Sequence, residues 1–361
     1  MQREITLNDT EALAIGAGIL GTGGGGNTYI GRVWLEKMLK EQGTPCRVID
    51  ADDVADDAWV CAIGTMGAPT VGNEKLYHGN EFIWSLRALE KHVGTPFAAI
   101  LVGEIGGANA LKPLISGLQL DLPVVDGDGM GRAFPELQMD TFSIAGIPLS
   151  PMALADNHGN VVIFDHMDTP LRTEQYARSL TVEMGGSAAL AMPCMTGKRM
   201  KSAIIRGTLS LAQRLGEVVL AARRDNEEPS EVVAVLGHGR VLFRGKIVDV
   251  ERRTVKGFAR GRLKLVAFGS PNDTMEIVFQ NENLVAWHNG EIVCTVPDLI
   301  CILGVEDGEP IGTEMLRYGL QVAVLGLPAP RELKTPAALE VVGPRAFGYD
   351  LDFAPMPGDL L

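Results

Sequence analysis

The chain has 361 residues, and its 32 Lys+Arg against 45 Asp+Glu give a formal net charge of −13 at pH 7. This balance argues against nucleic acid as a partner, because binding phosphates requires basic patches, and it argues equally against an anionic membrane surface. The hydrophobic share of 46% excludes a disordered chain, whereas 43 glycines, about 12% against a usual share of about 7%, indicate many specific backbone bends.

The first part of the chain alternates predicted helices with predicted strands. A helix capped by Asn8 or Asp9 should run to about Leu20, and a second should cover residues 28–42, where apolar residues recur at helical spacing. Because alternating strands and helices build βαβ units, we predict an α/β domain with a largely parallel or mixed sheet over residues 1–167. Its further strands are predicted at 46–50, 59–63, 97–102, 123–126 and 160–165, and its further helices at 80–92 and 108–118.

The second part, residues 168–361, has a different pattern. A helical segment is predicted over 185–224. From 231 to 330 the sequence consists of short alternating runs separated by Gly, Asn or Pro, the first of them at 232–236, and a tail follows over 331–361. Many short strands with turn signals predict a β-rich barrel or sandwich, and therefore a multidomain α+β protein overall.

Gly16, Gly18 and Gly21 form a literal Gly-x-Gly-x-x-Gly motif. In dinucleotide-binding folds this motif follows a strand, but here it closes a predicted helix. We therefore expect these glycines to allow close helix packing or to end the helix, rather than to bind a dinucleotide.

A second glycine-rich segment, Gly23, Gly24, Gly25 and Gly26, lies directly before Asn27 and the second predicted helix. Glycines free the backbone to expose N–H groups, and a helix N-terminus adds partial positive charge. These five residues are therefore candidates for binding an anion or a substrate carbonyl. A Walker motif would need Lys-Ser/Thr after the glycines, which is missing here, and a tight turn without a ligand is the alternative.

Three further loops follow predicted strands, and each combines glycines with acidic or polar side chains. In open parallel sheets, the loops at the carboxyl ends of the strands meet in a crevice where ligands bind. Ordinary turn chemistry is the alternative, since Asp and Gly are common in such turns. On the first interpretation the candidate catalytic residues are Asp126, Asp128, Glu104 and Lys75, and candidate substrate-binding residues are Thr65, Glu74 and Asn109.

Carboxylates in such a crevice could also hold a divalent metal ion. His158 and His166 flank a predicted strand and could supply imidazole, so the candidate metal ligands are Asp126, Asp128, His158 and His166. A surface or core role is the favoured alternative for these unclustered histidines, and the cofactor is left open. Asp298, at a predicted turn of the β-rich part, is the candidate contribution of the second domain to substrate binding.

The N-terminus and the cysteines indicate where the protein works. Met1–Glu4 is polar and lacks an apolar signal core. Five cysteines without a Cys-x-x-Cys pair argue against a disulfide framework, and no uncharged stretch reaches the about 18 apolar residues of a membrane span. We predict a cytoplasmic homo-oligomer that acts on a small molecule and binds neither nucleic acid nor membrane.

Several uncommon motifs stand in the order that is typical of one family. They are Gly16–Asn27, Gly64–Lys75, Gly103–Leu114, Val125–Arg132, Arg240–Arg253 and a tail that contains Arg345-Ala-Phe-Gly-Tyr349. Over nearly its whole length the chain resembles the S-methyl thiohydantoin desulfurase-like family, long described only as a domain of unknown function.

The resemblance implies a hydrolase that acts on a five-membered cyclic amide or thioamide, with a hydantoinase/oxoprolinase-type protein as a further partner. It also implies a C-terminal part similar to the swivelling barrels of hydantoinase-like proteins. In such a reaction water, activated by a carboxylate or a metal ion, would attack the ring carbon between the two nitrogens. A nucleotide-binding subunit and a non-catalytic partner of a hydantoinase-type enzyme are the alternatives.

For the hydrolase, the expected roles divide among the candidate residues. Asp126 and Asp128 would be the base or the metal ligands, and Glu104 and Glu74 would orient the ring N–H groups. Lys75 would stabilise the departing sulfur, while the Gly23–Gly26 loop or Asn109 would stabilise the developing anion.

Overall fold

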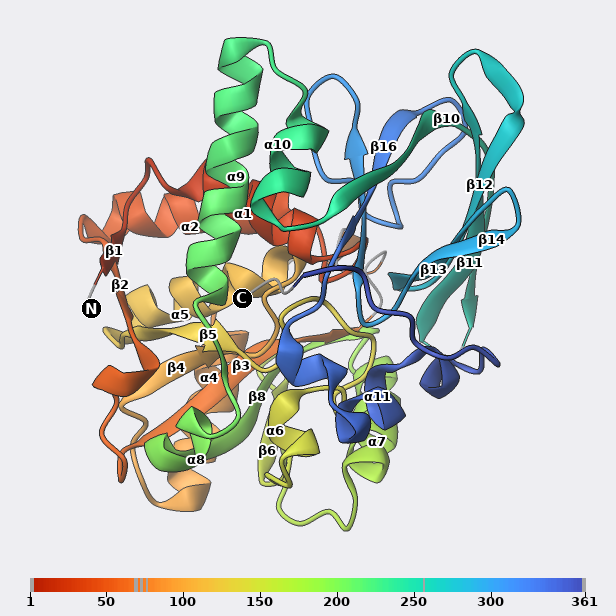
Figure 1. The fold of residues 1–361 in the computed structure, drawn as a ribbon. Coiled ribbons are helices and arrows are strands. Elements are labelled where there is room, and N and C mark those ends of the chain that lie inside the picture. The colour runs from red at the N-terminus through yellow and green to blue at the C-terminus, as the bar shows by residue number, and fades with distance from the viewer. Residues whose placement is uncertain (1–2, 68–70, 72–73, 76, 256, 359–361) are drawn as a thin grey trace.

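The computed structural model describes residues 3–67, 71, 74–75, 77–255 and 257–358. Figure 1 shows two β-sheets, one from the red-to-green part of the chain and one from the teal-to-blue part. The C-terminal helix α11 (Pro336–Val342) returns to the first part and lies beside α6 (Thr141–Ile144). This architecture confirms the predicted α/β part followed by a β-rich part. No helix of the described residues is long and apolar enough to cross a membrane.

The first sheet has mixed strand directions, as predicted. Its order is β1-β2-β5-β4-β3-β8-β6-β7, with β9 beside β5. Strands β2, β5, β4 and β3 pair in parallel, and the remaining pairs are antiparallel. The bounds are β1 (Arg3–Ile5), β2 (Cys46–Ile49), β3 (Trp59–Gly67), β4 (Ala99–Val102), β5 (Val124–Asp128), β6 (Met152–Ala155), β7 (Val161–Phe164), β8 (Ser187–Thr196) and β9 (Ile205–Arg206).

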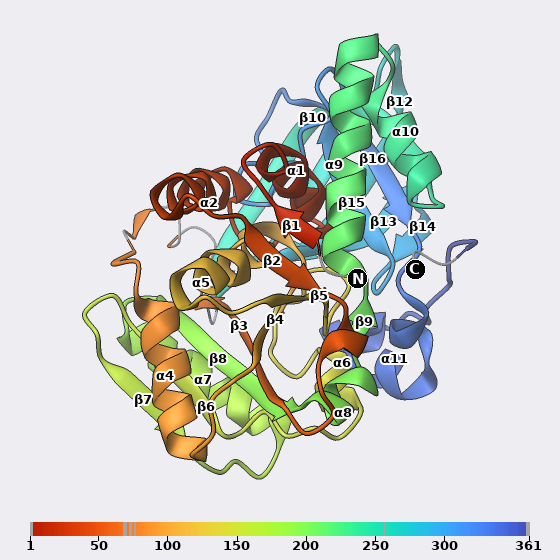
Figure 2. The same cartoon turned by 90° about the vertical axis from the view of Figure 1, so that its left-hand side faces the viewer.

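Helices cover both faces of this sheet because its central strands are apolar on both sides. Cys61 and Ile63 pack with α2, α4 and α5, whereas their neighbours Val60 and Ala62 pack with α6 and α8 on the other face. Figure 2 shows α4 and α5 on the near side of the sheet. The bounds are α2 (Thr28–Gln42), α4 (Glu81–Val93), α5 (Lys112–Leu120), α7 (Pro170–Glu183) and α8 (Gly197–Lys201), with 3-10 helices η1 (Ala51–Asp53), η2 (Gly107–Ala110), η3 (Arg331–Lys334) and η4 (Pro344–Phe347).

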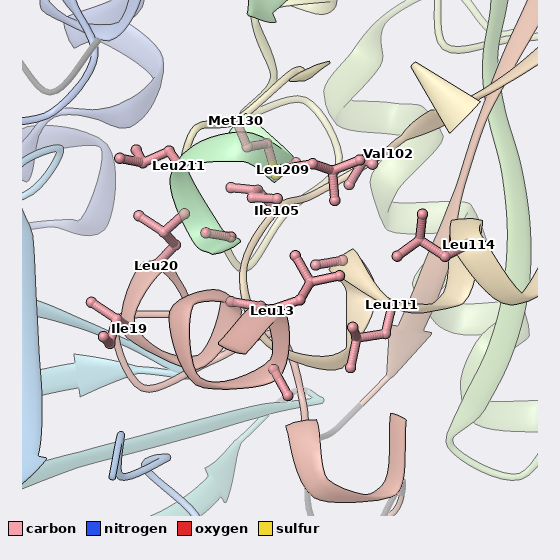
Figure 3. Packing of buried hydrophobic residues seen from close by; sticks show 14 of the residues in the cluster. Leu13, Ile19, Leu20, Val102, Ile105, Leu111, Leu114, Met130, Leu209 and Leu211 are labelled. Atoms are coloured by element: carbon pink, nitrogen blue, oxygen red, sulfur yellow. The ribbon is translucent and has the colours of Figure 1, made fainter. Parts of the chain in front are cut away.

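Helices α1 (Thr10–Leu20) and α9 (Thr208–Asp225) pack against each other through glycine. A Cβ atom at Gly16 would lie 1.7 Å from the Ala212 carbonyl oxygen, and one at Gly216 would lie 1.7 Å from the Ala12 carbonyl oxygen. Gly16 of the Gly-x-Gly-x-x-Gly motif therefore serves helix packing, and Gly21 ends α1 as its C-cap, as predicted. Figure 3 shows the core formed there, with side chains from α1 and α9 beside those that follow β4.

The second sheet is antiparallel throughout, in the order β14-β13-β12-β11-β10-β16-β15. It curls into a half-barrel, so that the Asn283 side chain on β13 donates a hydrogen bond to the Ile300 carbonyl oxygen on β15 at 2.9 Å. This confirms the predicted β-rich second part. The bounds are β10 (Arg240–Val255), β11 (Phe258–Ala267), β12 (Ser270–Gln280), β13 (Glu282–His288), β14 (Glu291–Thr295), β15 (Leu299–Gly304) and β16 (Gln321–Leu327).

Two predicted elements are wrong. Residues 187–196, predicted as part of a helical segment, form strand β8, which lies between β3 and β6. Their alanine-rich sequence has helix propensity, but a buried position between two strands overrides it. Residues 232–236, predicted as a strand because they are rich in valine, belong to helix α10 (Pro229–Leu236), which begins with proline at its first turn.

Candidate functional site

A cavity of about 130 Å³ lies where the carboxyl ends of β3 and β4 meet the first turn of α2 and the turn between β12 and β13. Its polar lining includes Thr65, Glu104, Asn109, Lys112 and Glu282. The first four come from β3, the loop after β4, η2 and the start of α5, whereas Glu282 is the first residue of β13. The cavity is therefore built by both sheets. Its apolar lining includes Trp34, Met66, Phe134, Leu190 and Met192.

A chain of hydrogen bonds orders the polar side of this cavity. The Lys112 ammonium group donates to Thr65 Oγ1 at 2.7 Å and to Asn109 Oδ1 at 3.0 Å. The Asn109 side-chain N–H donates to Glu104 Oε1 at 2.8 Å, and the backbone N–H of Phe134 donates to Glu104 Oε2 at 3.2 Å. Each carboxylate oxygen of Glu104 is thus oriented, and two of the three Lys112 N–H groups are used.

Glu104 is buried, and this burial raises its pKa to about 7. The hydrogen bonds from Asn109 and Phe134 and the positive charge of Lys112 oppose the rise. A carboxyl group whose pKa lies near neutral pH is suited to accept and return protons.

Glu282 is the second buried carboxyl group of the cavity. Burial and, after it, the negative charge of Glu104 raise its pKa well above the usual range, and the charge of Arg132 opposes this. Its Oε2 atom has no hydrogen-bond partner among the described residues. A protonated carboxyl group is the form that this environment favours.

The predicted glycine-rich loop lies at the cavity, but its residues differ in position. Gly25, Gly26 and Asn27 line the cavity, and the Asn27 side chain caps α2 by accepting a hydrogen bond from the Tyr29 backbone N–H. Gly23 and Gly24 do not line the cavity: Gly23 packs against Thr313, and Gly24 packs against the cavity residue Glu282.

Asp126 and Asp128 lie outside the cavity lining, although both were predicted to face the crevice. Asp126 accepts hydrogen bonds from the backbone N–H and the hydroxyl of Ser210, near the start of α9. Asp128 accepts hydrogen bonds from the backbone N–H groups of Ile105 and Met130, at 2.9 and 3.1 Å, and of Gly131. Asp128 therefore holds the loop after β4, which carries Glu104, against the loop after β5.

Three other predicted residues also lie outside the cavity lining. Lys75 donates hydrogen bonds to the carbonyl oxygens of Met184 and Ser187, both at 2.7 Å. Glu74 is exposed. Asp298 is buried and accepts hydrogen bonds from the backbone N–H groups of Ala329 and Met356, so that it anchors the C-terminal tail.

The predicted metal ligands are not brought together. His158 and His166 are exposed, whereas Asp126 and Asp128 are engaged with α9 and with backbone N–H groups. Within the described part of the chain, no three His, Cys, Asp or Glu side chains are placed to hold a metal ion. The donor set thus does not fit a resident metal ion.

Sequence reasoning missed five charged residues of the cavity lining, which are Lys112, Glu136, Asp140, Arg178 and Glu282. Lys112 stands three residues after Asn109 at a helix start, and this spacing could have linked the two side chains. Glu282 stands in an alternating strand pattern that carries no local sign of a site. The uncharged Tyr77 also lines the cavity.

Fold and cavity define a two-domain α+β protein with a polar site where its two sheets meet. The chain belongs to the S-Me-THD-like family: the model of the N-terminal domain matches residues 8–166, and that of the C-terminal domain matches residues 168–356. This confirms the resemblance to the S-methyl thiohydantoin desulfurase-like family. The chain is also similar to a protein from Chromobacterium violaceum with a known crystal structure, at 26% identity and a TM-score of 0.83, covering 98% of this chain and 99% of that one. The comparison with curated proteins gives no match.

Proposed function

We propose that the protein is a hydrolase of five-membered cyclic amides or thioamides of the thiohydantoin type. It cleaves the bond between the ring carbon and the sulfur atom of these substrates. The observation that carries this proposal is the Glu104 carboxyl group, oriented by Asn109 and Phe134 in a partly apolar cavity beside the Lys112 ammonium group. Family membership supports the type of substrate.

Each residue has a role in this reaction. Glu104 accepts a proton from water as the water oxygen attacks the ring carbon between the two nitrogens. The third N–H of Lys112, and the backbone of Gly25 and Gly26, stabilise the negative charge that develops on the ring. Apolar side chains such as Phe134 limit the access of bulk water and so strengthen these interactions.

The same lining argues against the nucleotide-binding alternative. Four acidic side chains face the cavity: Glu104, Glu136, Asp140 and Glu282. Ionised carboxylates repel phosphate groups, and protonated ones leave only the glycine-rich loop and Lys112 to hold a nucleotide. The homo-oligomer and the hydantoinase/oxoprolinase-type partner stay predictions, which light scattering and co-purification would test.

Release of methanethiol from an S-methyl thiohydantoin tests the proposal. We expect the wild-type protein to show a kcat/KM that rises with pH up to about 7, because Glu104 must be ionised to accept a proton. The Glu104→Gln substitution should lower kcat/KM at least about 100-fold. Asp126→Asn, in which a carboxylate outside the cavity lining is changed, should stay within about tenfold of wild type. A folded Glu104→Gln protein with full turnover would refute the assignment, and a strong loss in Asp126→Asn would favour the sequence-based one.

A further inference from the structure

Glu282 is held at the cavity by its neighbours in the chain. Asn281 has a left-handed backbone, with φ of 59°, and its side chain accepts a hydrogen bond from the Ala259 N–H at 2.8 Å. On the other side, the backbone N–H of Asn283 donates to the Thr22 carbonyl oxygen at 2.8 Å, and the Asn283 carbonyl accepts from the buried Arg132 guanidinium at 3.1 Å. The turn at the start of β13 is therefore fixed against the N-terminal part.

The charged groups around Glu282 give its carboxyl group a different protonation preference from that of Glu104. Glu104, Arg132 and Arg178 are the charged side chains that act on it. Arg178 is engaged with Glu174 and donates to the Pro135 carbonyl oxygen at 2.8 Å, and Arg132 donates to five backbone and side-chain oxygens. Neither arginine forms an ion pair with Glu282 among the described contacts, so its burial favours the protonated carboxyl group, whereas Lys112 and the hydrogen bonds of Asn109 and Phe134 favour the ionised form of Glu104.

We propose that Glu282 is the proton donor to the departing sulfur, so that the second domain completes the active site of the first. This inference rests on the proposed function. As water attacks, its oxygen forms a bond to the ring carbon, one water proton passes to Glu104, and the C=N electron pair moves to the ring nitrogen. That electron pair then reforms the double bond as the carbon–sulfur bond breaks, and the sulfur leaves with its electrons and takes the Glu282 proton.

The proton balance connects the two carboxyl groups. The products are a thiol and the hydroxy form of the cyclic amide, which tautomerises in water. Glu104 ends protonated and Glu282 ionised, so one proton must pass between them before the next turnover. Two carboxyl groups that face one cavity suit this exchange.

Leaving-group dependence tests this role. An S-methyl substrate expels a strongly basic thiolate that needs a proton, whereas an S-(4-nitrophenyl) substrate with the same ring expels a weakly basic one that does not. Glu282→Gln should lose about 10²–10⁴-fold in kcat/KM with the S-methyl substrate, and less than about tenfold with the nitrophenyl substrate. Glu314→Gln is the matched control, because Glu314 is a partly buried carboxyl of the same domain that does not line the cavity; it should leave both rates unchanged.

An equal loss with both substrates, or no loss, would overturn the proposal. If Glu282→Gln does not fold, the wild-type protein still decides: the basic limb of its pH profile should be present with the S-methyl substrate and absent with the nitrophenyl substrate, and identical limbs would refute the role. Wild-type protein that turns over neither substrate would instead refute the proposed function.

Discussion

Glu282 lies so close to Gly24 that a Cβ atom at position 24 would come within 1.9 Å of its Oε1 atom. A side chain at position 24 would force the Glu282 carboxyl group to move, so glycine at this position leaves the space that the carboxyl group occupies. One glycine of the loop thus serves a contact between the two domains rather than a ligand.

Gly24→Ala should therefore displace Glu282. We expect a loss of at least about 100-fold in turnover of the S-methyl substrate, with unfolding free energy lowered by about 1–3 kcal/mol from overpacking. Gly43→Ala is the control, since Gly43 has φ of 67°, has open space around it and does not line the cavity. This variant should lower the free energy of unfolding by about 1 kcal/mol through backbone strain and should keep full activity. Wild-type turnover in Gly24→Ala would contradict the contact.

Lys112→Met should shift the pH profile as well as slow the reaction. The Lys112 charge lowers the pKa of Glu104, so its removal raises that pKa above about 7. The acid limb of the kcat/KM profile should then move to higher pH. Lys264→Met, on an exposed part of β11, should not move it. An unchanged midpoint in Lys112→Met would show that the ammonium group does not act on Glu104.

Asp140 makes stability depend on pH. Burial raises its pKa to about 7, although its carboxylate accepts a hydrogen bond from Ser143. The folded state therefore binds this proton more tightly than the unfolded state, and the stability that it adds at low pH is lost as the pH rises through about 7. When the pH rises from 5 to 8, the free energy of unfolding of the wild-type protein should fall by about 2–3 kcal/mol more than that of Asp140→Asn, as measured by denaturant titration. Parallel curves would contradict the raised pKa.

Arg132 should be among the most sensitive positions for stability. Its guanidinium is fully buried and donates hydrogen bonds to Ala133, Pro297, Asp298, Thr22 and Asn283. Arg132→Leu leaves these oxygens without a donor and should lower the free energy of unfolding by about 3–5 kcal/mol. Arg262→Leu removes ion pairs at the surface of β11, which are screened by solvent, and should lower the free energy of unfolding far less. If the two variants lowered the free energy of unfolding equally, the buried hydrogen bonds of Arg132 would stabilise the protein no more than surface ion pairs do.

Local sequence rules located much of the cavity. Thr65, Glu104 and Asn109 follow or end neighbouring parallel strands, so their side chains had to gather at one edge of the sheet. The same rule misplaced Asp126 and Asp128. Strand β9, which lies far away in sequence, pairs with Gly127 and Asp128 and extends β5 beyond its predicted end. Asp126 therefore accepts hydrogen bonds from Ser210 on α9, and Asp128 accepts them from backbone N–H groups.

The sequence by itself determined the two kinds of sheet, the glycine-rich loops and the strand ends that carry Glu104, because these follow from short-range periodicity and turn chemistry. Only the tertiary structure decided that Glu282 faces the same cavity. The two glutamates are separated by a long stretch of chain and lie in different sheets. The two glutamates come close together because the second sheet curls into a half-barrel and packs on the first part of the chain through Arg132. No local sequence pattern predicts either of these long-range arrangements.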